Sequence, residues 1–277
     1  MSLSLNITGI QTKLHWEDKK ANLEMLEEKI FSISQPTEIV VLPEMFSTGF
    51  SMQPEKLAET MQDETVQWMK RIATGKKIIL TGSVIIKEEK NPGWPADRFY
   101  NRLIWMLPKG QFGYYDKRHL FAYADEDKHY SAGNKRLIAS VKGWKINLFV
   151  CYDLRFPVWT RQSPSRKEQN SFEYDVLIYV ANWPEKRITA WKTLLQARAI
   201  ENQCYAVGIN RVGEDGNKIY YSGDSMVIDP LGEILYHKKD EEDIFTLNLD
   251  RSHLEKIREK FPFWKDADQF NIITKTG

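Results

Sequence analysis

Short apolar runs that alternate with helical segments limit the folds open to this chain more than any other feature of its sequence. The apolar runs include residues 38–42, 77–86, 146–150, 175–181 and 204–210, and charged or turn-forming residues bound them. Runs of this length predict buried β-strands. Helical patterns lie between them at 18–31, 63–74 and 189–202. Because such helices pack on the sheets that the strands form, the alternation predicts an α/β fold built from layers.

The remaining segments complete this layered pattern. Further strands are predicted at 3–11, 99–107, 111–115, 225–228, 233–236 and 244–249. Gly75 is expected to end the helix at 63–74, and Ser252 is expected to cap a short last helix. The charged stretch 124–130 lacks periodicity and is predicted to be a surface loop. No internal repeat, low-complexity tract or linker divides the chain, so residues 1–277 are predicted to form a single domain.

The charge balance argues against nucleic acid and membrane surfaces as partners. Lys and Arg number 39 while Asp and Glu number 38, which gives a formal net charge of +1. Proteins that bind phosphate backbones or anionic lipids usually carry a cluster of basic residues. The first residues lack the basic and apolar regions of a signal peptide, and no apolar run reaches the ~18 residues of a membrane span. We therefore expect a cytoplasmic protein.

Cysteine and histidine are both scarce. With only Cys151 and Cys204 in the chain, a disulfide framework is not expected. The histidines, at 15, 119, 129, 237 and 253, show no metal-ligand spacing with these cysteines. The sequence therefore predicts no metal and no cofactor.

Cys151 occupies a position that suits a nucleophile. The apolar run Ile146 to Val150 brings it to the carboxyl end of a predicted strand, where the pattern turns polar. Free N–H groups of a following helix would stabilise a thiolate there. The alternative is a structural thiol, because free cysteine usually packs as a small hydrophobic residue.

Two other ionisable residues directly follow predicted strands. Glu44 comes after the strand at 38–42, and Lys117 comes after the strand at 111–115. In layered α/β folds, polar residues at the carboxyl ends of strands converge on one rim. Each has a structural alternative, since Glu44 could be a loop charge and Lys117 could form a surface pair with Asp116. Their occurrence together with Cys151 indicates an active site.

Five separated stretches carry a resemblance to a known family. They are Val40-Val-Leu-Pro-Glu-Met-Phe46, Tyr115-Asp-Lys-Arg-His-Leu-Phe121, Val150-Cys-Tyr-Asp-Leu-Arg-Phe-Pro157, Ala197-Arg-Ala-Ile-Glu-Asn202 and Gly223-Asp-Ser-Met-Val-Ile-Asp-Pro-Leu-Gly232. In this order the chain resembles the nitrilase superfamily of carbon–nitrogen hydrolases, and within it the omega-amidases. The resemblance spans nearly the whole chain. It implies a nitrilase-like αββα sandwich and a Glu–Lys–Cys triad, here Glu44, Lys117 and Cys151.

The implied chemistry fits these residue types. An amide reacts poorly, so its hydrolysis needs a strong nucleophile, a base and a donor for the oxyanion. Cys151 would attack the amide carbon, Glu44 would move the protons, and Lys117 and the backbone N–H of Tyr152 would hold the oxyanion. The resemblance also implies a second glutamate, which Glu126 matches. Asp125 and Asp127 flank it.

The omega-amidases act on short dicarboxylate monoamides, so the resemblance implies a substrate such as 2-oxoglutaramate or 2-oxosuccinamate. Arg155 and Arg187 follow the strand ends nearest the expected pocket, and a guanidinium matches a carboxylate in shape. These arginines could instead be structural ion-pair partners. The residues expected to wall the pocket are aromatic: Phe46, Phe50, Tyr123, Phe156 and Trp183.

The resemblance further implies a homodimer. Residues 157–161 and the C-terminal tail, about 250–277, are the expected interface segments, while Trp191 is expected to lie in the core or at a subunit contact. Other functions remain open. The chain could be a related hydrolase acting on a nitrile, an N-carbamoyl compound or another small amide, an acyl transferase, a non-catalytic scaffold, or a redox-sensing thiol protein. A Cys–His protease is disfavoured, because neither His119 nor His129 lies in a matching motif.

Overall fold

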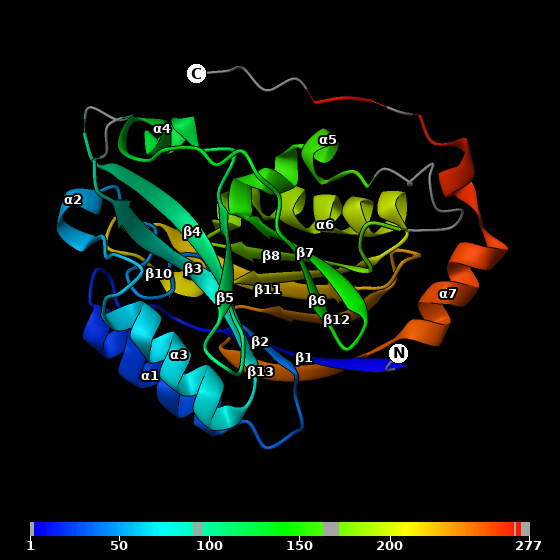
Figure 1. Cartoon of the computed structure of the whole chain (residues 1–277), viewed down its shortest axis with the longest axis horizontal. Helices are drawn as coiled ribbons and strands as arrows, with labels where there is room; N and C mark the ends of the chain where they lie inside the picture. Colours follow the sequence, from blue (N-terminus) through cyan, green and yellow to red (C-terminus); the bar gives the residue numbers. More distant parts are fainter. Residues whose placement is uncertain (1–2, 91–92, 94–95, 163–171, 269, 273–277) are drawn as a thin grey trace.

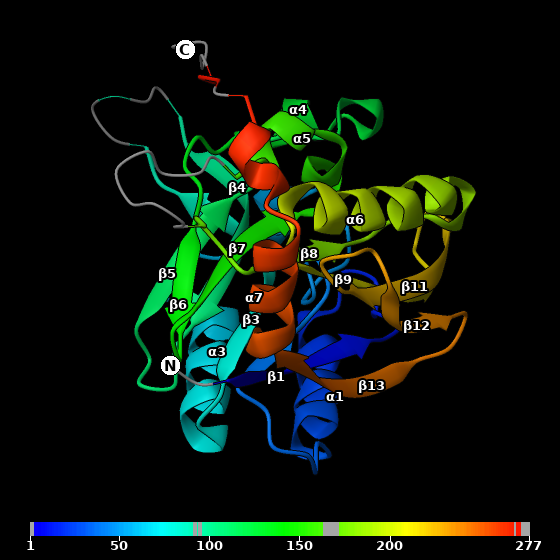
Figure 2. The ribbon, with the colours of Figure 1, turned by 90° about the vertical axis from the view of Figure 1, so that its right-hand side faces the viewer.

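Two β-sheets pack face to face, and helices cover the outer face of each sheet (Figure 1). The computed structural model describes residues 3–90, 93, 96–162, 172–268 and 270–272. Turned by 90°, it shows four layers in order, with α6 over one sheet and α1 and α3 under the other (Figure 2). The fold is therefore an αββα sandwich, and the predicted fold class is confirmed.

The first sheet has the strand order β13-β1-β2-β3-β4-β5. Its strands are β1 (Ser4–Gln11), β2 (Ile39–Val41), β3 (Ile79–Glu88), β4 (Arg98–Met106), β5 (Phe112–Asp116) and β13 (Asp243–Asp250). Helices α1 (Lys19–Phe31) and α3 (Glu64–Lys76) pack on its outer face, and the short α2 (Pro54–Leu57) lies near β3. The buried apolar side chains of α1 and α3, such as Leu26 and Met69, form one core with Val40 and Leu80 of this sheet.

The second sheet has the strand order β10-β11-β9-β8-β7-β6, and β12 pairs with β11. Its strands are β6 (Ile138–Val141), β7 (Trp144–Val150), β8 (Val176–Ala181), β9 (Tyr205–Asn210), β10 (Val212–Glu214), β11 (Tyr220–Ile228) and β12 (Ile234–Lys239). Helix α6 (Ile188–Asn202) covers its outer face against β9 and β11. Trp191 of α6 is fully buried in the main core, which decides the sequence-based alternative in favour of the core.

Parallel pairing brings the critical strand ends to one rim. β1, β2 and β3 run parallel in the first sheet, and β7, β8 and β9 run parallel in the second. The inner faces share one core, in which Ile7 and Val41 of the first sheet pack with Phe149 and Val180 of the second. Residues that follow β2, β7 and β8 are therefore held by buried strands on both sides.

The helix ends differ slightly from the sequence-based expectations. The first helix was expected to begin at Asp18, which instead caps α1, and its side chain accepts a hydrogen bond from the N–H of Ala21. The helix α3 continues past Gly75 to Lys76, and Lys77 takes the left-handed conformation that ends it. Asp250, not Ser252, caps α7 (Arg251–Lys260), because its carboxylate accepts the N–H of Ser252.

The sequence did not reveal five short elements. These are β6, β10, α2, α4 (Glu126–His129) and α5 (Pro157–Thr160). Each has three or four residues, which is too short to carry a periodic apolar pattern. The polar stretch 124–130 thus holds a turn of 3-10 helix (Ala122–Ala124) followed by α4, where a loop was expected. None of the described helices is long and apolar enough to span a membrane.

Gly82 of β3 allows the segment after β2 to approach the sheet. A Cβ atom there would lie 2.7 Å from a ring carbon of Phe46 and 2.9 Å from the Cβ of Leu42. We therefore expect Gly82→Ala to lower the free energy of unfolding by about 1–3 kcal/mol in urea denaturation. Gly75→Ala is the matched control, because a Cβ there meets no atom within 4 Å. The control is expected to raise stability by up to ~1 kcal/mol. Equal stability of the two variants would contradict the close packing at Gly82.

Candidate active site

A buried ion-pair cluster lies at the rim where the strand ends meet. The Nζ of Lys117 lies 2.9 Å from the Oε1 of Glu44 and 2.9 and 3.0 Å from the two carboxylate oxygens of Glu126. All three side chains are almost completely buried. The structure thus brings Glu126 to Lys117, while its neighbours Asp125 and Asp127 are exposed.

Backbone contacts from different elements fix these three residues. The turn after β2 places Glu44, and the next N–H, of Met45, donates to the Oγ of Ser83 on β3. Lys117 directly follows β5, and its N–H donates to the carbonyl of Asn101 on β4. Glu126 begins α4. Three elements separated in sequence therefore present one cation between two carboxylates.

The electrostatics of the cluster favour a protonated lysine. Burial alone would lower the pKa of Lys117, but the charges of Glu126 and Glu44 outweigh burial and raise this pKa. Burial also raises the pKa of Glu126, and the charge of Glu44 adds to the rise while Lys117 opposes it. Lys117 therefore stays cationic, and it compensates two carboxylates that would otherwise repel each other.

Cys151 sits in a strained turn at the end of β7. Its backbone φ is 45°, a left-handed value that a residue with a side chain rarely adopts. The carboxylate of Asp153 holds the turn, accepting the N–H of Val150 at 3.1 Å and the hydroxyl of Tyr115 at 2.8 Å. The N–H of His119 donates to the same carboxylate at 3.0 Å. The geometry resembles a nucleophile elbow, in which the strand end directs the thiol toward the rim.

The surroundings of Cys151 act on the pKa of its thiol in opposite directions. Burial raises the pKa of Cys151, and the charge of Glu44 raises it further, while Lys117 opposes both effects. The Sγ lies 3.9 Å from the carbonyl oxygen of Asn182. The sequence-based expectation of a stabilised thiolate rested on the N–H groups of a following helix and left out burial and the charge of Glu44. A neutral thiol needs a base to become a nucleophile.

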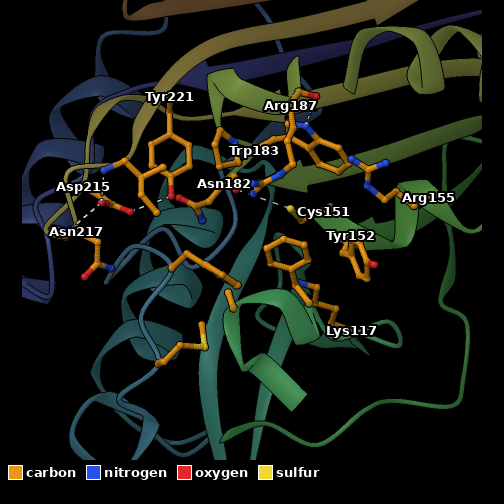
Figure 3. Close-up of a pocket in the computed structure, with 16 residues that line it drawn as sticks. Lys117, Cys151, Tyr152, Arg155, Asn182, Trp183, Arg187, Asp215, Asn217 and Tyr221 are labelled. Carbon is orange, nitrogen blue, oxygen red and sulfur yellow. Dashed lines mark hydrogen bonds between the residues drawn. The ribbon is translucent and has the colours of Figure 1, made fainter. Parts of the chain in front are cut away.

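A cavity of about 180 Å³ opens beside Cys151, and Lys117 and Tyr152 contribute to its wall (Figure 3). In this view Asp215, Asn217 and Tyr221 lie to the left of Cys151, and Arg155 lies to its right. All of these residues line the same cavity. The cavity therefore joins the thiol to two guanidinium groups.

The two arginines have no carboxylate partner among the described residues. The guanidinium of Arg155 lies 5.0 Å from the ring centre of Trp183, and that of Arg187 lies 5.0 Å from the ring centre of Phe121. Asp215 lines the cavity, but its carboxylate already accepts the hydroxyl of Tyr221 and the N–H groups of the next turn. The described residues therefore do not support the alternative that Arg155 and Arg187 are structural ion-pair partners.

The expected aromatic wall is only partly correct. Phe50 and Trp183 line the cavity. Phe46 does not, because it is buried between the first sheet and its helices, where its ring packs against Trp68. Phe156 stacks on His119 with ring centres 3.8 Å apart, outside the lining. Tyr123 is 86% exposed and is likewise absent from the lining.

Sequence reasoning missed several lining residues. Asn182 directly follows β8, so the signal that drew attention to Cys151, a polar residue after an apolar run, was present there too. Asp215, Asn217 and Tyr221 come from the hairpin between β10 and β11, which carries no distinctive sequence pattern. Met52 follows the turn that carries Glu44. Residues on such turns become neighbours of Cys151 only through the pairing of the sheets.

The two histidines near the site, His119 and His129, lie outside the cavity. The Nδ1 of His119 lies 2.8 Å from the carboxylate of Asp153, and His129 lies on α4. Neither residue lines the cavity. Within the described residues, no group of three or more His, Cys, Asp and Glu side chains is arranged to hold a metal ion.

Lys117→Met is expected to destabilise the protein strongly at neutral pH. The variant leaves the carboxylates of Glu44 and Glu126 buried without their cation. Breaking a buried pair in this way costs about 3–5 kcal/mol. The measurement is the free energy of unfolding at pH 7 from urea denaturation. Lys142→Met is the control, because its ion pair with Glu38 is half exposed and is worth about 0–1 kcal/mol.

The loss in Lys117→Met is expected to shrink as the pH falls from 7 to 5. Burial and the charge of Glu44 already raise the pKa of Glu126, so without Lys117 the folded state holds protons that the unfolded state releases above about pH 4.3. A raised carboxyl pKa makes stability fall as the pH rises from the unfolded to the folded value. The same loss at pH 5 and pH 7 would contradict an electrostatic origin.

Comparisons with known proteins agree with this geometry. The carbon-nitrogen hydrolase family model matches residues 6–259. Omega-amidase YafV of Escherichia coli strain K12 is 43% identical over 272 residues, covering 97% of this chain and 98% of the relative. A 2-oxoglutaramate amidase of Bacillus subtilis is 30% identical over 263 residues, covering 94% and 96%.

A solved structure is also closely similar. XC1258 from Xanthomonas campestris is described as a CN-hydrolase superfamily protein with an arsenic adduct in the active site. It superposes with a TM-score of 0.91 at 39% identity, covering 97% of this chain and 99% of that one. Together with the match of the family model over most of the chain, this similarity shows that the protein belongs to the carbon-nitrogen hydrolase family.

Proposed function

We propose that this enzyme is an omega-amidase, which hydrolyses the terminal amide of a short 2-oxo dicarboxylate monoamide such as 2-oxoglutaramate or 2-oxosuccinamate. The products are the 2-oxo acid and ammonia. Cys151 is the nucleophile, Glu44 is the general base and acid, and Lys117 stabilises the oxyanion. The single observation that carries the proposal is a thiol in a cavity that also holds two arginines without a carboxylate partner among the described residues.

In the first half of the reaction, Glu44 takes the proton of the Cys151 thiol as the sulfur attacks the amide carbon. The carbonyl oxygen becomes an oxyanion, which the Nζ of Lys117 and the N–H of Tyr152 stabilise. Glu44 then returns the proton to the amide nitrogen. The carbon–nitrogen bond breaks, ammonia leaves, and the acyl group remains on Cys151 as a thioester.

In the second half, water replaces ammonia. Glu44 takes a proton from the water as its oxygen attacks the thioester carbon, and the same two donors hold the new oxyanion. The carbon–sulfur bond breaks, the 2-oxo acid leaves, and Glu44 returns the proton to the Cys151 sulfur. Glu126 orients Lys117 and the substrate amide throughout, which its two contacts with the Nζ of Lys117 support.

The charge of the cavity supports an anionic substrate. Arg155 and Arg187 can bind the carboxylate at the end of the substrate away from the amide, because a guanidinium offers paired donors. Asp215 is the only carboxylate that lines the described cavity, and its oxygens already accept hydrogen bonds from its own hairpin. The cavity thus offers cations for a carboxylate but no free anion for the ammonium group of glutamine. This difference favours a 2-oxo acid amide over an amino acid amide.

Quaternary structure and location are further parts of the proposal. A homodimer would bury apolar side chains on α5 and on the tail, where Val158 is 54% exposed and Phe263 is 66% exposed. Trp264 lies in the same tail, and Phe172 packs on its ring. A reducing, cytoplasmic location suits a chain whose described cysteines, Cys151 and Cys204, are both free thiols.

The test is ammonia release from 2-oxoglutaramate and 2-oxosuccinamate, measured beside glutamine, asparagine, a simple nitrile and an N-carbamoyl amino acid. The 2-oxo amides are expected to be the best substrates. Cys151→Ala should reduce their turnover by at least about a thousandfold. Turnover confined to the nitrile or the N-carbamoyl compound would move the protein to another branch of the family. Thiol oxidation without any hydrolysis, unchanged in Glu44→Gln, would favour a redox-sensing role.

A second variant in the same assay tests the carboxylate end of the cavity. Arg187→Gln removes one charge-assisted contact, so KM for 2-oxoglutaramate is expected to rise about 10- to 100-fold with a smaller change in kcat. Arg118→Gln is the control, because the Arg118 guanidinium lies over Trp159 and does not line the cavity. An unchanged KM in Arg187→Gln would assign the carboxylate to Arg155.

A further inference from the structure

Asn101 contacts every member of the buried ion-pair cluster. It lies on β4 and is fully buried. Its Nδ2 donates to the Oε1 of Glu44 at 2.8 Å and to the Oε1 of Glu126 at 3.3 Å. Its backbone carbonyl accepts the N–H of Lys117 at 3.0 Å. No other described side chain donates to both carboxylates except Lys117 itself.

The cluster has an electrostatic imbalance that Asn101 reduces. Two carboxylates share one ammonium group, and all three are removed from water. Buried like charges raise each other's proton affinity unless nearby donors stabilise the ionised forms. The two hydrogens of a side-chain amide supply such donors without adding a charge. Asn101 therefore helps to stabilise the two carboxylates, as a second cation would.

The contacts of the Glu44 carboxylate show how much depends on this amide. Its Oε1 accepts from Lys117 and Asn101, and its Oε2 accepts the N–H of Asn182 at 2.8 Å. The charge of Glu44 raises the pKa of both Cys151 and Glu126, so a negative charge on either of these groups is disfavoured. Glu44 also acts electrostatically on the hydroxyl groups of Tyr130 and Tyr221. Asn101 thus supplies one of the hydrogen bonds that hold the carboxylate in place.

We propose that Asn101 is a positioning residue of this active site, whose side-chain amide bridges the carboxylates of Glu44 and Glu126 and holds Glu44 in place to accept the thiol proton. This inference rests on the proposed function, in which Glu44 is the base. The unpartnered Oδ1 of Asn101 agrees with a donor role for the side chain. Removing the amide should favour the protonated carboxylate and leave less of the active base at a given pH.

The experiment follows alkylation of Cys151 by iodoacetamide as a function of pH, which needs no assumption about the substrate. Peptide mapping by mass spectrometry separates Cys151 from Cys204. The rate in the unmodified enzyme is expected to fall toward acid pH as Glu44 takes up a proton. This falling part of the pH profile is the acid limb. Glu44→Gln should lack this acid limb. If the limb is unchanged in Glu44→Gln, Glu44 is not the base, and the proposed function fails separately from the role of Asn101.

Asn101→Leu keeps the size of the side chain and removes its donors. We expect its acid limb to move up by about one pH unit, so that alkylation below the limb becomes about tenfold slower. Asn101→Asp is expected to move the limb in the same direction, because it adds a third carboxylate. This polar variant of equal size covers the case in which the leucine variant does not fold, which circular dichroism would reveal.

Asn147→Leu is the matched control. Asn147 lies on β7, is fully buried, and its side-chain amide has no hydrogen-bond partner within the described structure. Its replacement should leave the acid limb where the unmodified enzyme has it, whatever it does to stability. The proposal is overturned if both Asn101 variants keep the acid limb at the same pH as the unmodified enzyme, as expected for Asn147→Leu. Asn101 would then have a packing role only.

Discussion

The ion pair of Lys117 with Glu44 and Glu126 is the interaction on which the rest of the site depends. It lies out of water, where the charge of the lysine compensates the two buried carboxylates. The three residues come from a turn after β2, the end of β5 and the start of α4. Burying them together requires the whole first sheet to be in place. The fold therefore brings together a cluster that fixes the charges beside Cys151.

The same burial sets the chemistry of the thiol. Burial and Glu44 raise the pKa of Cys151, so in the proposed mechanism the nucleophile forms as Glu44 takes the thiol proton. A base and a nucleophile held in one buried cluster make proton transfer and attack parts of a single event. The strained turn at Cys151, with its φ of 45°, is held by Asp153 from behind the site. The site therefore combines a strained backbone with a buried thiol at the same residue.

Much of this architecture could be predicted from the sequence, and particular residues show why the rest could not. The buried strands carry continuous apolar runs, so the polar residues after them, Glu44 and Cys151, stood out. The short hairpin with Asp215 and Tyr221 has no such pattern, and only sheet pairing brings it to the cavity. Phe46 was predicted to face the pocket, but the missing side chain of Gly82 lets it turn into the core. The state of the thiol depends on burial, which sequence position does not reveal.

The most direct test of the account is to trap the acyl group on Cys151. The enzyme would be mixed with 2-oxoglutaramate, quenched in acid at short times and examined by intact-protein mass spectrometry, with hydroxylamine added in a parallel reaction. The account predicts an adduct with the mass of the substrate less ammonia, located on Cys151, and a hydroxamate that forms at the expense of the 2-oxo acid. Ammonia release with neither adduct nor hydroxamate would mean that water attacks the amide directly, and would contradict the account.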